Sequence, residues 1–405
     1  MSINKFLNSL EDPNNPILGP TIAGLKFSGL LLPESKTRKN VYIFLHMSCF
    51  LLAATEYIDI WFVKNDTMLL MANLKVSMLA TISVFKVSTF LIWQKRWIKI
   101  LSYVSKTNLE QIKSTDLINH QILAKMTKYC RKVTYIYWSL TYFTAISIIL
   151  QPIMKYVLSS TYRENLRTGE ENYLQVISSY VPFDKTTLPG YIAAFFYQST
   201  ETLFAAAWIA SFDSNAIVIM TFFHLEIELL KRDSSKIFGS PNSYVGRQEL
   251  EKRIKNCHAR HVNMMRHAKL FNSCLSPIML LYMLVCSIML CVTTYQMSVE
   301  NSFIQKCMTA EFLVFGVSQL FLYCWHSNSV FYASQELHQG PYESAWWRNT
   351  SHRKDVLILI MQFRKIVVFS AGPFSDLTLP TFISILKGAY SYYTILSQSN
   401  EYSNQ

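Results

Sequence analysis

The sequence predicts an all-α membrane protein with seven transmembrane helices. Hydrophobic residues make up 51% of the 405 residues and charged residues only 16%, and the apolar residues gather in long runs separated by basic, polar segments. A bilayer core needs about 20 apolar residues in a helix and leaves no backbone group unsatisfied, so each long run is expected to form one span. A single membrane domain over residues 1–405 is therefore predicted.

The seven spans are expected at about residues 41–63, 68–93, 133–157, 190–223, 271–296, 307–332 and 378–397. The fourth is longer than a bilayer requires at a rise of about 1.5 Å per residue. Its last part, from Asp213 to Leu230, alternates apolar residues with His224, Glu226 and Glu228. This helix is therefore predicted to continue into the cytosol.

Lysine and arginine are divided unequally between the two sides of these spans. The amino-terminal segment and the second, fourth and sixth loops hold 29 of them, whereas the remaining loops hold 5. The positive-inside rule then predicts a cytoplasmic amino terminus and an extracellular carboxyl terminus. This division also accounts for the net charge of +12, so no nucleic-acid partner is expected.

One further apolar segment competes with this topology as an eighth span. Residues Asp355–Phe369 are strongly apolar, but Gln362, Arg364 and Lys365 interrupt them near the middle. The segment is shorter than a bilayer core requires, and charge inside a membrane is costly. A cytosolic helix at about residues 353–370 is the favoured interpretation, and an eighth span is the alternative.

The cysteines, the histidines and one sequon give weaker signals. Five of the eight cysteines lie inside expected spans and two in basic loops, so no disulfide framework is predicted. Cys257 and His261 are one helical turn apart, but no second ligand pair completes a metal site, and no motif indicates an enzyme or a cofactor. The sequon that begins at Asn65 lies in the first outer loop and weakly predicts glycosylation there.

Nine charged residues fall inside the expected spans, where charge is costly and often functional. They reach an interface, pair with one another or act directly in function, and the sequence leaves these alternatives open. Lys387, near the middle of the last span, is the hardest to place at an interface. The nine are Glu56, Asp59, Lys75, Lys86, Lys155, Glu201, Asp213, Glu311 and Lys387.

Aromatic, methionine and hydroxyl side chains gather in the outer halves of the second, third, fourth and sixth spans. A cavity for an apolar small molecule needs such a lining, because burial supplies affinity and one or two hydrogen bonds supply orientation. The same composition also fits an ordinary membrane core. The candidate ligand-binding residues are Met78, Phe143, Ile146, Ser147, Phe195, Phe196, Ser199, Thr200, Phe312 and Phe315.

The last expected span carries a polar and aromatic stripe near its extracellular end. Ser391, Thr394 and Gln398 belong to this stripe, which lipid does not favour. In a bundle the stripe is expected to face protein or water. Ile395, apolar between the polar positions, is then a candidate constriction that closes a pore by excluding water.

Seven spans also suggest a G-protein-coupled receptor, but the motifs of that class are missing. No acidic-Arg-aromatic triplet closes the third span, and no Asn-Pro-x-x-Tyr motif lies in the seventh. The expected orientation is also inverted relative to that class. A metabotropic seven-helix receptor that binds a G protein through the basic loops therefore remains an alternative only.

The carboxyl-terminal third of the chain resembles the insect odorant receptor family. The matching residues are the run Tyr323-Cys324-Trp325-His326-Ser327-Asn328, then Tyr342 with Trp346-Trp347, the helix around residues 361–365, and Phe382-Ile383-Ser384-Ile385-Leu386 with Tyr390-Ser391-Tyr392-Tyr393. Asp213, His224 and His261 extend the resemblance back to the fourth span.

Two departures decide which branch of the family the chain resembles. Ser391-Tyr392 and Gln398-Ser399 keep only part of the ending found in gustatory receptors. The loop of about fifty residues after the fourth span lacks the long insertion of the shared co-receptor. The resemblance thus indicates a ligand-tuned odorant receptor subunit, with a gustatory-type receptor channel as the alternative.

This resemblance implies a subunit that binds a small volatile hydrophobic ligand and forms a heterotetramer with the co-receptor. The assembly is expected to conduct monovalent and divalent cations across the plasma membrane of an olfactory neuron dendrite, surrounded by lipid. Carried onto this chain, Ile395 would occupy the gate beside Thr394, and Gln398 the outer pore lining. Lys387 is then expected to pair or to face away from the lumen, because a cation path disfavours a positive lining.

Overall fold

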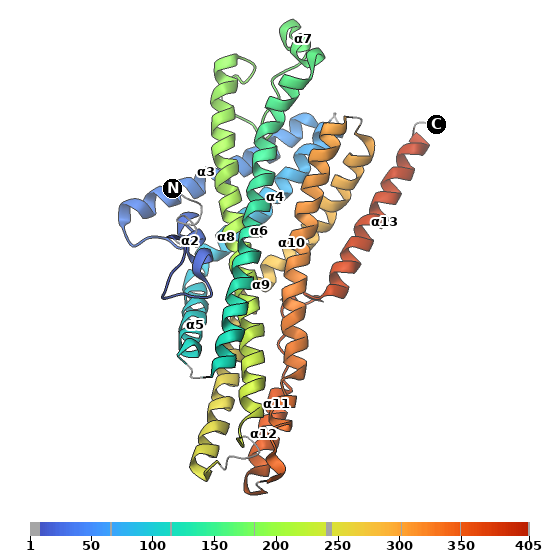
Figure 1. Ribbon diagram of the computed structural model, residues 1–405. Helices are drawn as coiled ribbons and strands as arrows, with labels where there is room; N and C mark the ends of the chain where they lie inside the picture. Colours follow the sequence, from blue (N-terminus) through green and yellow to red (C-terminus); the bar gives the residue numbers. More distant parts are fainter. Residues whose placement is uncertain are drawn as a thin grey trace.

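The structure is a computed structural model that describes residues 9–64, 67–113, 116–181, 183–239, 245–300, 302–348 and 350–403. Within these ranges the chain is almost entirely helical, and its long helices lie side by side in one elongated bundle (Figure 1). The prediction of an all-α protein is confirmed.

Six helices of the described chain are long and apolar enough to cross a membrane, and they match the first six expected spans in order. They are α3 (Lys36–Val63), α4 (Thr67–Ile92), α6 (Leu117–Leu158), α8 (Leu188–Ser235), α9 (Arg247–Val299) and α10 (Phe303–Glu336). α13 (Leu379–Ser403) covers the seventh expected span, and its crossing of a membrane stays a prediction.

Shorter elements connect and cover these helices. They are α2 (Gly19–Phe27), α5 (Gln94–Ile112), α7 (Ser160–Thr168), α11 (Gln339–Tyr342), the 3₁₀ turns Trp346–Arg348 and Thr350–His352, α12 (Arg353–Phe363), and the strands β1 (Ser370–Ala371) and β2 (Ser375–Asp376). α2 and α5 lie beside the bundle near its middle, in segments where the sequence predicted no particular element (Figure 1).

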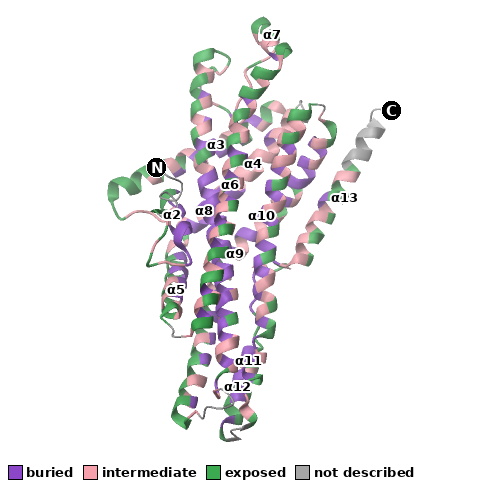
Figure 2. Cartoon of the chain, in the orientation of Figure 1, coloured by how far each residue is buried: buried purple, intermediate pink, exposed green. Residues whose placement is uncertain are grey.

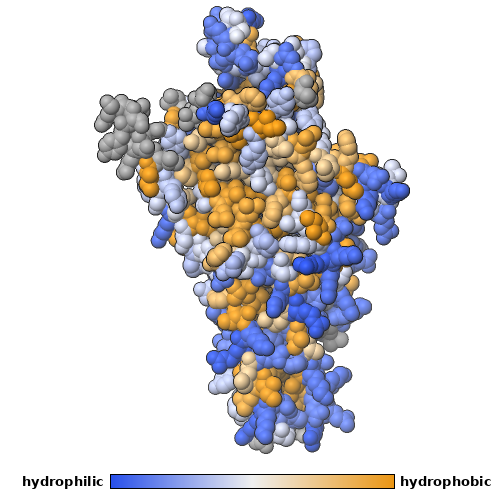
Figure 3. All heavy atoms as spheres, turned by 180° about the vertical axis from the view of Figure 1, so that it is seen from behind, coloured by the Kyte–Doolittle hydropathy of each residue, from blue (hydrophilic) through white to orange (hydrophobic). Residues whose placement is uncertain are grey.

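Three of the long helices extend well beyond a bilayer. α6, α8 and α9 contain 42, 48 and 53 residues, so each is longer than about 60 Å. On the face shown in Figure 3, hydrophobic residues form a broad band across the upper half, below a hydrophilic tip, and the lower half combines hydrophilic residues with smaller hydrophobic patches. The expected continuation of the fourth span past Asp213 is confirmed, since α8 runs unbroken to Ser235.

We call that lower half the basic end; it comprises α11, α12, the lower part of α5 and the adjoining ends of α6, α8, α9 and α10. α6 begins at the basic end, where the Asp116 carboxylate accepts a hydrogen bond from the Ile118 N–H and caps the first turn. At its other end α6 stops at Ser159, which is extended and caps α7 through the Tyr162 N–H.

α8 is the central helix of the bundle. Almost every residue from Ala206 to Leu230 is buried, and α8 packs against α6, α10, α9 and α2. Figure 2 shows this burial along the middle of the bundle, while the outer faces of α3 and α6 are exposed. A helix that is apolar all round belongs in such a core position, whereas helices with one exposed apolar face suit contact with lipid.

The expected cytosolic helix is shorter than the sequence predicted. α12 begins at Arg353 as expected but ends at Phe363 rather than near Ser370. Beyond it, the Val367 N–H donates to Ser334 Oγ at 3.1 Å, and Phe369 is buried in the core. Contacts with α10 and the core therefore replace the helical hydrogen bonds in this apolar segment. At 11 residues, α12 is also too short for a span.

A small hairpin directs the chain from α12 into α13. β1 and β2 pair antiparallel, with Ser370 opposite Asp376, and Gly372 makes the turn with φ of 62°. The Ser370 N–H donates to Asn272 Oδ1 at 2.9 Å, and the Gly372 N–H donates to Ser276 Oγ at 2.9 Å. These bonds hold the hairpin on α9. α13 then leaves the bundle and diverges from it toward the carboxyl terminus (Figure 1).

Candidate functional site

An apolar cavity lies between α3, α4, α6, α8 and α10. The space between atoms there, including the part that is open to the surroundings, is about 720 Å³. Aliphatic and small side chains form most of its wall. The lining residues are Cys49, Leu52, Ala53, Glu56, Val76, Leu79, Ala80, Ser83, Val84, Thr141, Thr144, Ala145, Ile148, Ile177, Glu201, Thr202, Ala205, Ala206, Trp208, Ile209 and Phe315.

Small residues create this space where α6 and α8 face each other. Thr141, Thr144 and Ala145 recur at helical spacing on α6, and Ala205 and Ala206 lie on α8. Larger side chains at these positions would fill the cavity, since protein interiors are otherwise closely packed. Trp208 and Phe315 supply aromatic surface to the wall.

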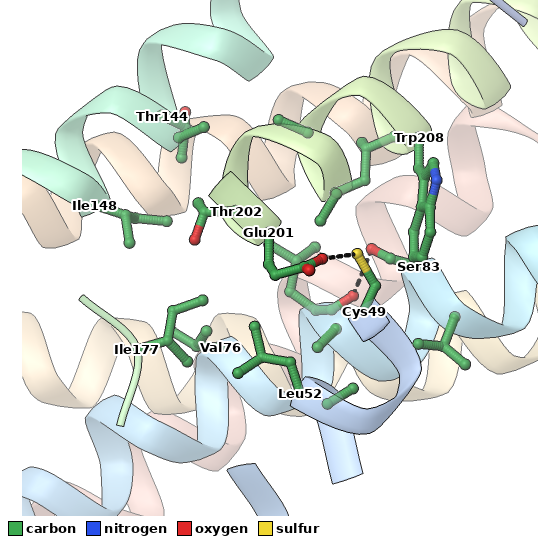
Figure 4. A pocket seen from close by; sticks show the side chains of 18 of the residues that line it. Cys49, Leu52, Val76, Ser83, Thr144, Ile148, Ile177, Glu201, Thr202 and Trp208 are labelled. Atoms are coloured by element: carbon green, nitrogen blue, oxygen red, sulfur yellow. Dashed lines mark hydrogen bonds between the residues drawn. The ribbon is translucent and has the colours of Figure 1, made fainter. Parts of the chain in front are cut away.

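The Glu201 carboxylate is held in place on the α3 side of the cavity. Its two oxygens accept hydrogen bonds from the Ser48 hydroxyl and from the Cys49 thiol, each at 2.6 Å. Figure 4 shows the Glu201 side chain reaching from α8 toward Cys49 on α3. The Tyr197 hydroxyl lies 3.3 Å from Ser48 Oγ and extends this network. The carboxylate therefore links α3 to α8 at the cavity wall.

Glu56 is the second acid in the lining and has much less support. Its side chain is buried, with an exposed fraction of 2%, and Oε2 has no hydrogen-bond partner in the structure. A carboxylate oxygen buried without a donor is costly, so this position is an energetic defect in the empty cavity. Among the described residues that line the cavity, Glu56 and Glu201 carry the only charges, and both are acidic.

A buried ion pair lies about one helical turn below the cavity. Lys86 Nζ on α4 contacts Asp213 Oδ1 on α8 at 2.6 Å, and both side chains are almost fully buried. The hydroxyls of Tyr137 and Tyr323 each donate to the same carboxylate at 2.6 Å, and the Gln319 amide also donates to it. This cluster joins α4, α6, α8 and α10, and it pairs two of the nine charges that the sequence placed inside spans.

A second cavity lies beside the first and is lined by charges of both signs. It has about 1320 Å³ of unfilled space, and Lys75, Lys155 and Glu311 line it together with Ser147 and Phe312. Lys75 Nζ donates to the Gln296 side-chain oxygen at 2.9 Å. This cavity is therefore more polar than the first, although Glu311 Oε1 also has no hydrogen-bond partner in the structure.

The sequence selected four of the five cavity helices but few of the lining residues. Phe315 lines the first cavity, and Ser147 and Phe312 line the second. Phe143 and Phe196 are exposed at 59% and 66%, on faces of α6 and α8 that suit lipid. Ile146 and Thr200 are also exposed, and Met78, Phe195 and Ser199 are half-buried; none of these seven lines either cavity.

The reason for this difference is that the sequence analysis favoured large aromatic residues. In a membrane helix both the core-facing and the lipid-facing sides are apolar, so a large aromatic residue does not identify the inner face. The informative signal was the run of small and hydroxyl residues on α6, together with an acid on α3 and another on α8. Leu52, Ala53 and Glu56 also show that α3, which the sequence analysis left out, contributes to the wall.

The candidate pore residues lie on α13. Ile395 is 61% exposed and Thr394 is half-buried in this single chain, and Lys387 is also exposed. The side chain of Gln398 lies outside the described residues, as does Asn65 of the weak sequon. Two exposed tyrosines, Tyr390 and Tyr392, add to the exposed surface of α13.

Ion pairs and one buried histidine organise the basic end. Arg260 on α9 contacts Glu226 at 3.1 Å and also pairs with Asp233, both on α8. Burial raises the pKa of Glu226, and Arg260 counteracts this only in part. The hydrogen bond from Lys236 is the main cause that lowers the pKa of Asp116 to about 2. Burial lowers the pKa of His261, whose ring packs on Phe363 of α12, to about 4.

A family profile described as 7tm Odorant receptor matches residues 66–390 of the chain. The chain belongs to the odorant receptor family. The profile covers most of the sequence, from α4 to the middle of α13, and so includes all of α4, α6, α8 and α10 around the cavity. The resemblance noted in the carboxyl-terminal third is therefore confirmed.

Curated relatives agree with this assignment over shorter segments. This odorant receptor chain is 28% identical over 144 residues to Odorant receptor Or2 of Anopheles gambiae, a match that covers 35% of the chain and 38% of that relative. It is 26% identical over 170 residues to the Odorant receptor coreceptor of Aedes albopictus, covering 41% of the chain and 36% of that relative. The matched segments thus span less than half of either relative.

Solved structures show the same fold over nearly the whole chain. The insect olfactory receptor OR5 from Machilis hrabei superposes with a TM-score of 0.78 at 16% identity, covering 94% of this chain and 97% of that one. Its complex with eugenol gives the same TM-score and covers 98% of both chains. The arrangement of the bundle is therefore that of an insect olfactory receptor.

Proposed function

We propose that this chain is the ligand-tuned subunit of an odorant-gated, non-selective cation channel that it forms as a heterotetramer with the family's co-receptor. The observation that carries the proposal is the apolar cavity between α3, α4, α6, α8 and α10. An odorant bound there contacts the helices that surround the buried Lys86–Asp213 pair, so binding energy can bias their packing. The proposed site of action is the plasma membrane of an olfactory neuron dendrite.

The pore is proposed to lie along α13. This helix diverges from the bundle, and its exposed polar and aromatic side chains have no partner surface in the single chain among the described residues. Four such helices around a central axis would cover one another and form a path for monovalent and divalent cations. Ile395 would then close the pore, with Thr394 and Gln398 lining it.

The ligand residues proposed from sequence now divide into two groups. The first group contains Phe315, which lines the first cavity, and Ser147 and Phe312, which line the second. These three residues are proposed to contact a ligand directly or through a neighbouring residue. The other seven, Met78, Phe143, Ile146, Phe195, Phe196, Ser199 and Thr200, are proposed to act only through packing or contact with lipid. Substitutions at Thr144 or Ala206 should therefore reorder odorant preference more than substitution of Phe143 does.

The orientation proposed from the basic residues places the basic end in the cytosol. This fits the ion pairs of Arg260, Arg232 and Lys236, which would then lie in a hydrated compartment. Antibody labelling of intact cells with a tag at each terminus tests it. We expect labelling of the carboxyl-terminal tag alone, and labelling of the amino-terminal tag alone would contradict the orientation.

The channel is tested by expressing the chain with the co-receptor and recording current while a panel of volatiles is applied. We expect at least one volatile to evoke a cation current that needs both subunits and persists when G-protein signalling is blocked. A response that disappears under this blockade would favour the metabotropic alternative. Current from the co-receptor alone, unaffected by this chain, would contradict the proposal.

The gate is tested with Ile395→Ser, which places a small polar residue where an apolar side chain is proposed to exclude water. We expect larger ligand-independent current or altered ion selectivity in the heteromer. Ile383→Ser, in the lower part of the same helix and half exposed, is the matched control and should have much less effect. Single-channel recording at fixed stoichiometry is the measurement. Unchanged basal current, conductance and permeability at normal surface expression would contradict this placement of Ile395.

A further inference from the structure

Two carboxylates line the apolar cavity, and no basic side chain lines it among the described residues. Glu56 enters from α3 and Glu201 from α8. An ester can use only the protonated form of an acid and a terpene neither form, whereas an ammonium ion pairs with the ionised form. The charge pattern of the wall therefore indicates a ligand that donates hydrogen bonds or carries positive charge.

The two acids play different parts. Both oxygens of Glu201 already accept hydrogen bonds, from Ser48 and Cys49, which fixes the position of this carboxylate. Glu56 Oε2 has no partner although the side chain is only 2% exposed. Glu56 is thus the group with unused hydrogen-bonding capacity, and Glu201 adds negative potential to the same space.

The nearby cations do not neutralise these acids. Lys86 is bound by Asp213 at 2.6 Å below the cavity, and Lys185 lies 3.4 Å from Asp59. Lys75 donates to Gln296 and faces the second cavity. In the described chain, neither Glu56 nor Glu201 has a lysine, arginine or histidine within ion-pair distance. A ligand can therefore supply the positive charge that pairs with one of these acids.

We propose that the cavity selects small volatile amines, which bind as ammonium ions against Glu56 with their apolar tails along the aliphatic wall. This inference rests on the proposed function and specifies the ligand class of its site. An alkylammonium titrates in the range of lysine, near about 10.4, so it is charged at neutral pH. It offers several N–H donors, and its charge-assisted bond to a carboxylate is about twice as strong as a neutral hydrogen bond.

The rest of the lining suits such a tail. The aliphatic residues of the wall are Leu52, Val76, Leu79, Ile148 and Ile209. Each methylene of a ligand that packs against them is removed from water, which favours binding. Trp208 and Phe315 add aromatic faces, which attract cations as well as apolar groups. An alcohol of the same skeleton keeps the apolar contacts but brings no positive charge to pair with Glu56.

The test uses matched ligands that differ only in their polar group. Cells expressing the chain with the co-receptor receive 2-phenylethylamine, 2-phenylethanol or 2-phenylethyl acetate while current is recorded. We expect the amine to reach half-maximal current at a concentration at least about tenfold lower than the alcohol, equivalent to one charge-assisted bond. An amine that is no more potent than the alcohol or the ester would overturn the assignment of ligand class.

Substitutions then assign the effect to the cavity. Glu56→Gln keeps the size of the side chain and removes its charge, and it should reduce the potency ratio of amine to alcohol about tenfold. Glu201→Gln should reduce this ratio less, because Glu201 already has two partners. The matched control is Glu164→Gln, an exposed acid of α7 outside both cavities, which should leave the ratio unchanged. An unchanged ratio in Glu56→Gln would contradict its role.

Failure of this inference can be distinguished from failure of the proposed function. If esters or alcohols open the channel and amines do not, the channel stands and the amine assignment is overturned. If no volatile evokes current, binding is measured directly as the thermal shift of the purified chain in detergent with 2-phenylethylamine. A shift that Glu56→Gln removes supports the amine site without gating, and no shift overturns the amine site.

Discussion

Asp213 and Glu56 are both acids buried within the helical bundle, yet their surroundings are opposite. The Asp213 carboxylate contacts the Lys86 ammonium and accepts hydrogen bonds from two tyrosines and a glutamine. Glu56 faces an apolar cavity with one oxygen unpartnered. Because removing a carboxylate from water is costly unless it is paired, the first acid is part of the scaffold and the second is available to a ligand.

This difference shows how a membrane receptor can hold a ligand site next to a rigid core. The cluster around Asp213 fixes four helices about one turn from the cavity, and each helix also contributes to the cavity wall through a neighbouring residue such as Ser83 or Phe315. A ligand that alters the packing of the wall therefore acts on four helices that the cluster around Asp213 holds together.

The largest expected effect comes from breaking the paired acid. Asp213→Ala leaves the Lys86 ammonium buried without a counter-ion and should cost about 3–5 kcal/mol. Surface expression and the thermal unfolding of purified protein should both fall sharply. The double variant Lys86→Met with Asp213→Leu removes both charges and should recover part of the loss. If Asp213→Ala is as stable as the native chain, the cluster is not a scaffold.

A paired acid at the basic end should show a smaller effect of the same kind. Arg260→Ala leaves Glu226, which is 1% exposed, without its cation and should cost about 1–3 kcal/mol. Arg260 itself is one-third exposed, so water can replace part of the lost contact. Thermal unfolding of the variant measures this cost. If Arg260→Ala destabilises the protein as much as Asp213→Ala does, the cost of removing a charged partner does not depend on how deeply the pair is buried.

For the unpaired acid the expected effect on stability is smaller still. Glu56→Leu removes a buried carboxylate that has an unpartnered oxygen, and the empty receptor should lose less than about 1 kcal/mol or become more stable. The same thermal unfolding assay serves here, without ligand. Destabilisation comparable to that of Asp213→Ala would show that Glu56 has a structural partner, and the comparison between the two acids would fail.

The scaffold and the cavity also differ in how much of each could be predicted from the sequence. The order of the helices and the continuation of α8 past Asp213 follow from runs of apolar residues, and these predictions are confirmed. Lys86 and Asp213 were recognisable as costly charges inside spans, but they are 127 positions apart and only the folded bundle shows that they pair.

The cavity residues were harder to predict for a physical reason. Phe143 and Phe196 have the chemistry of a binding site, yet they lie on exposed faces, because lipid and core both accept apolar side chains. Thr144 and Ala206 leave room for the cavity because they are small. Small residues are also common where membrane helices simply pack together, so the sequence does not distinguish a cavity from a close contact. The end of α12 at Phe363 likewise depends on contacts with Ser334, a distant part of the chain.

The smallest expected effect is the pH dependence of an exposed pair. Lys236 and Arg232 hold the pKa of Asp116 at about 2, below its unfolded value of about 3.9. This contribution to stability is therefore present above about pH 4 and is lost as the pH falls toward 2. Asp116→Asn should cost less than about 1 kcal/mol at neutral pH. In thermal unfolding, the difference from the native chain should shrink as the pH falls through 2 and be lost only below both pKa values.

The most direct test of the central claim is to fill the cavity and record ligand-evoked current. In Ala206→Leu the larger side chain occupies space that the ligand is proposed to use, whereas Ala193→Leu changes an exposed position on the same helix. With the co-receptor and at matched surface expression, Ala206→Leu should raise the half-maximal concentration of the active volatile at least about tenfold, and Ala193→Leu should not change it. Unchanged concentration–response curves in Ala206→Leu would contradict the claim that this cavity gates the channel.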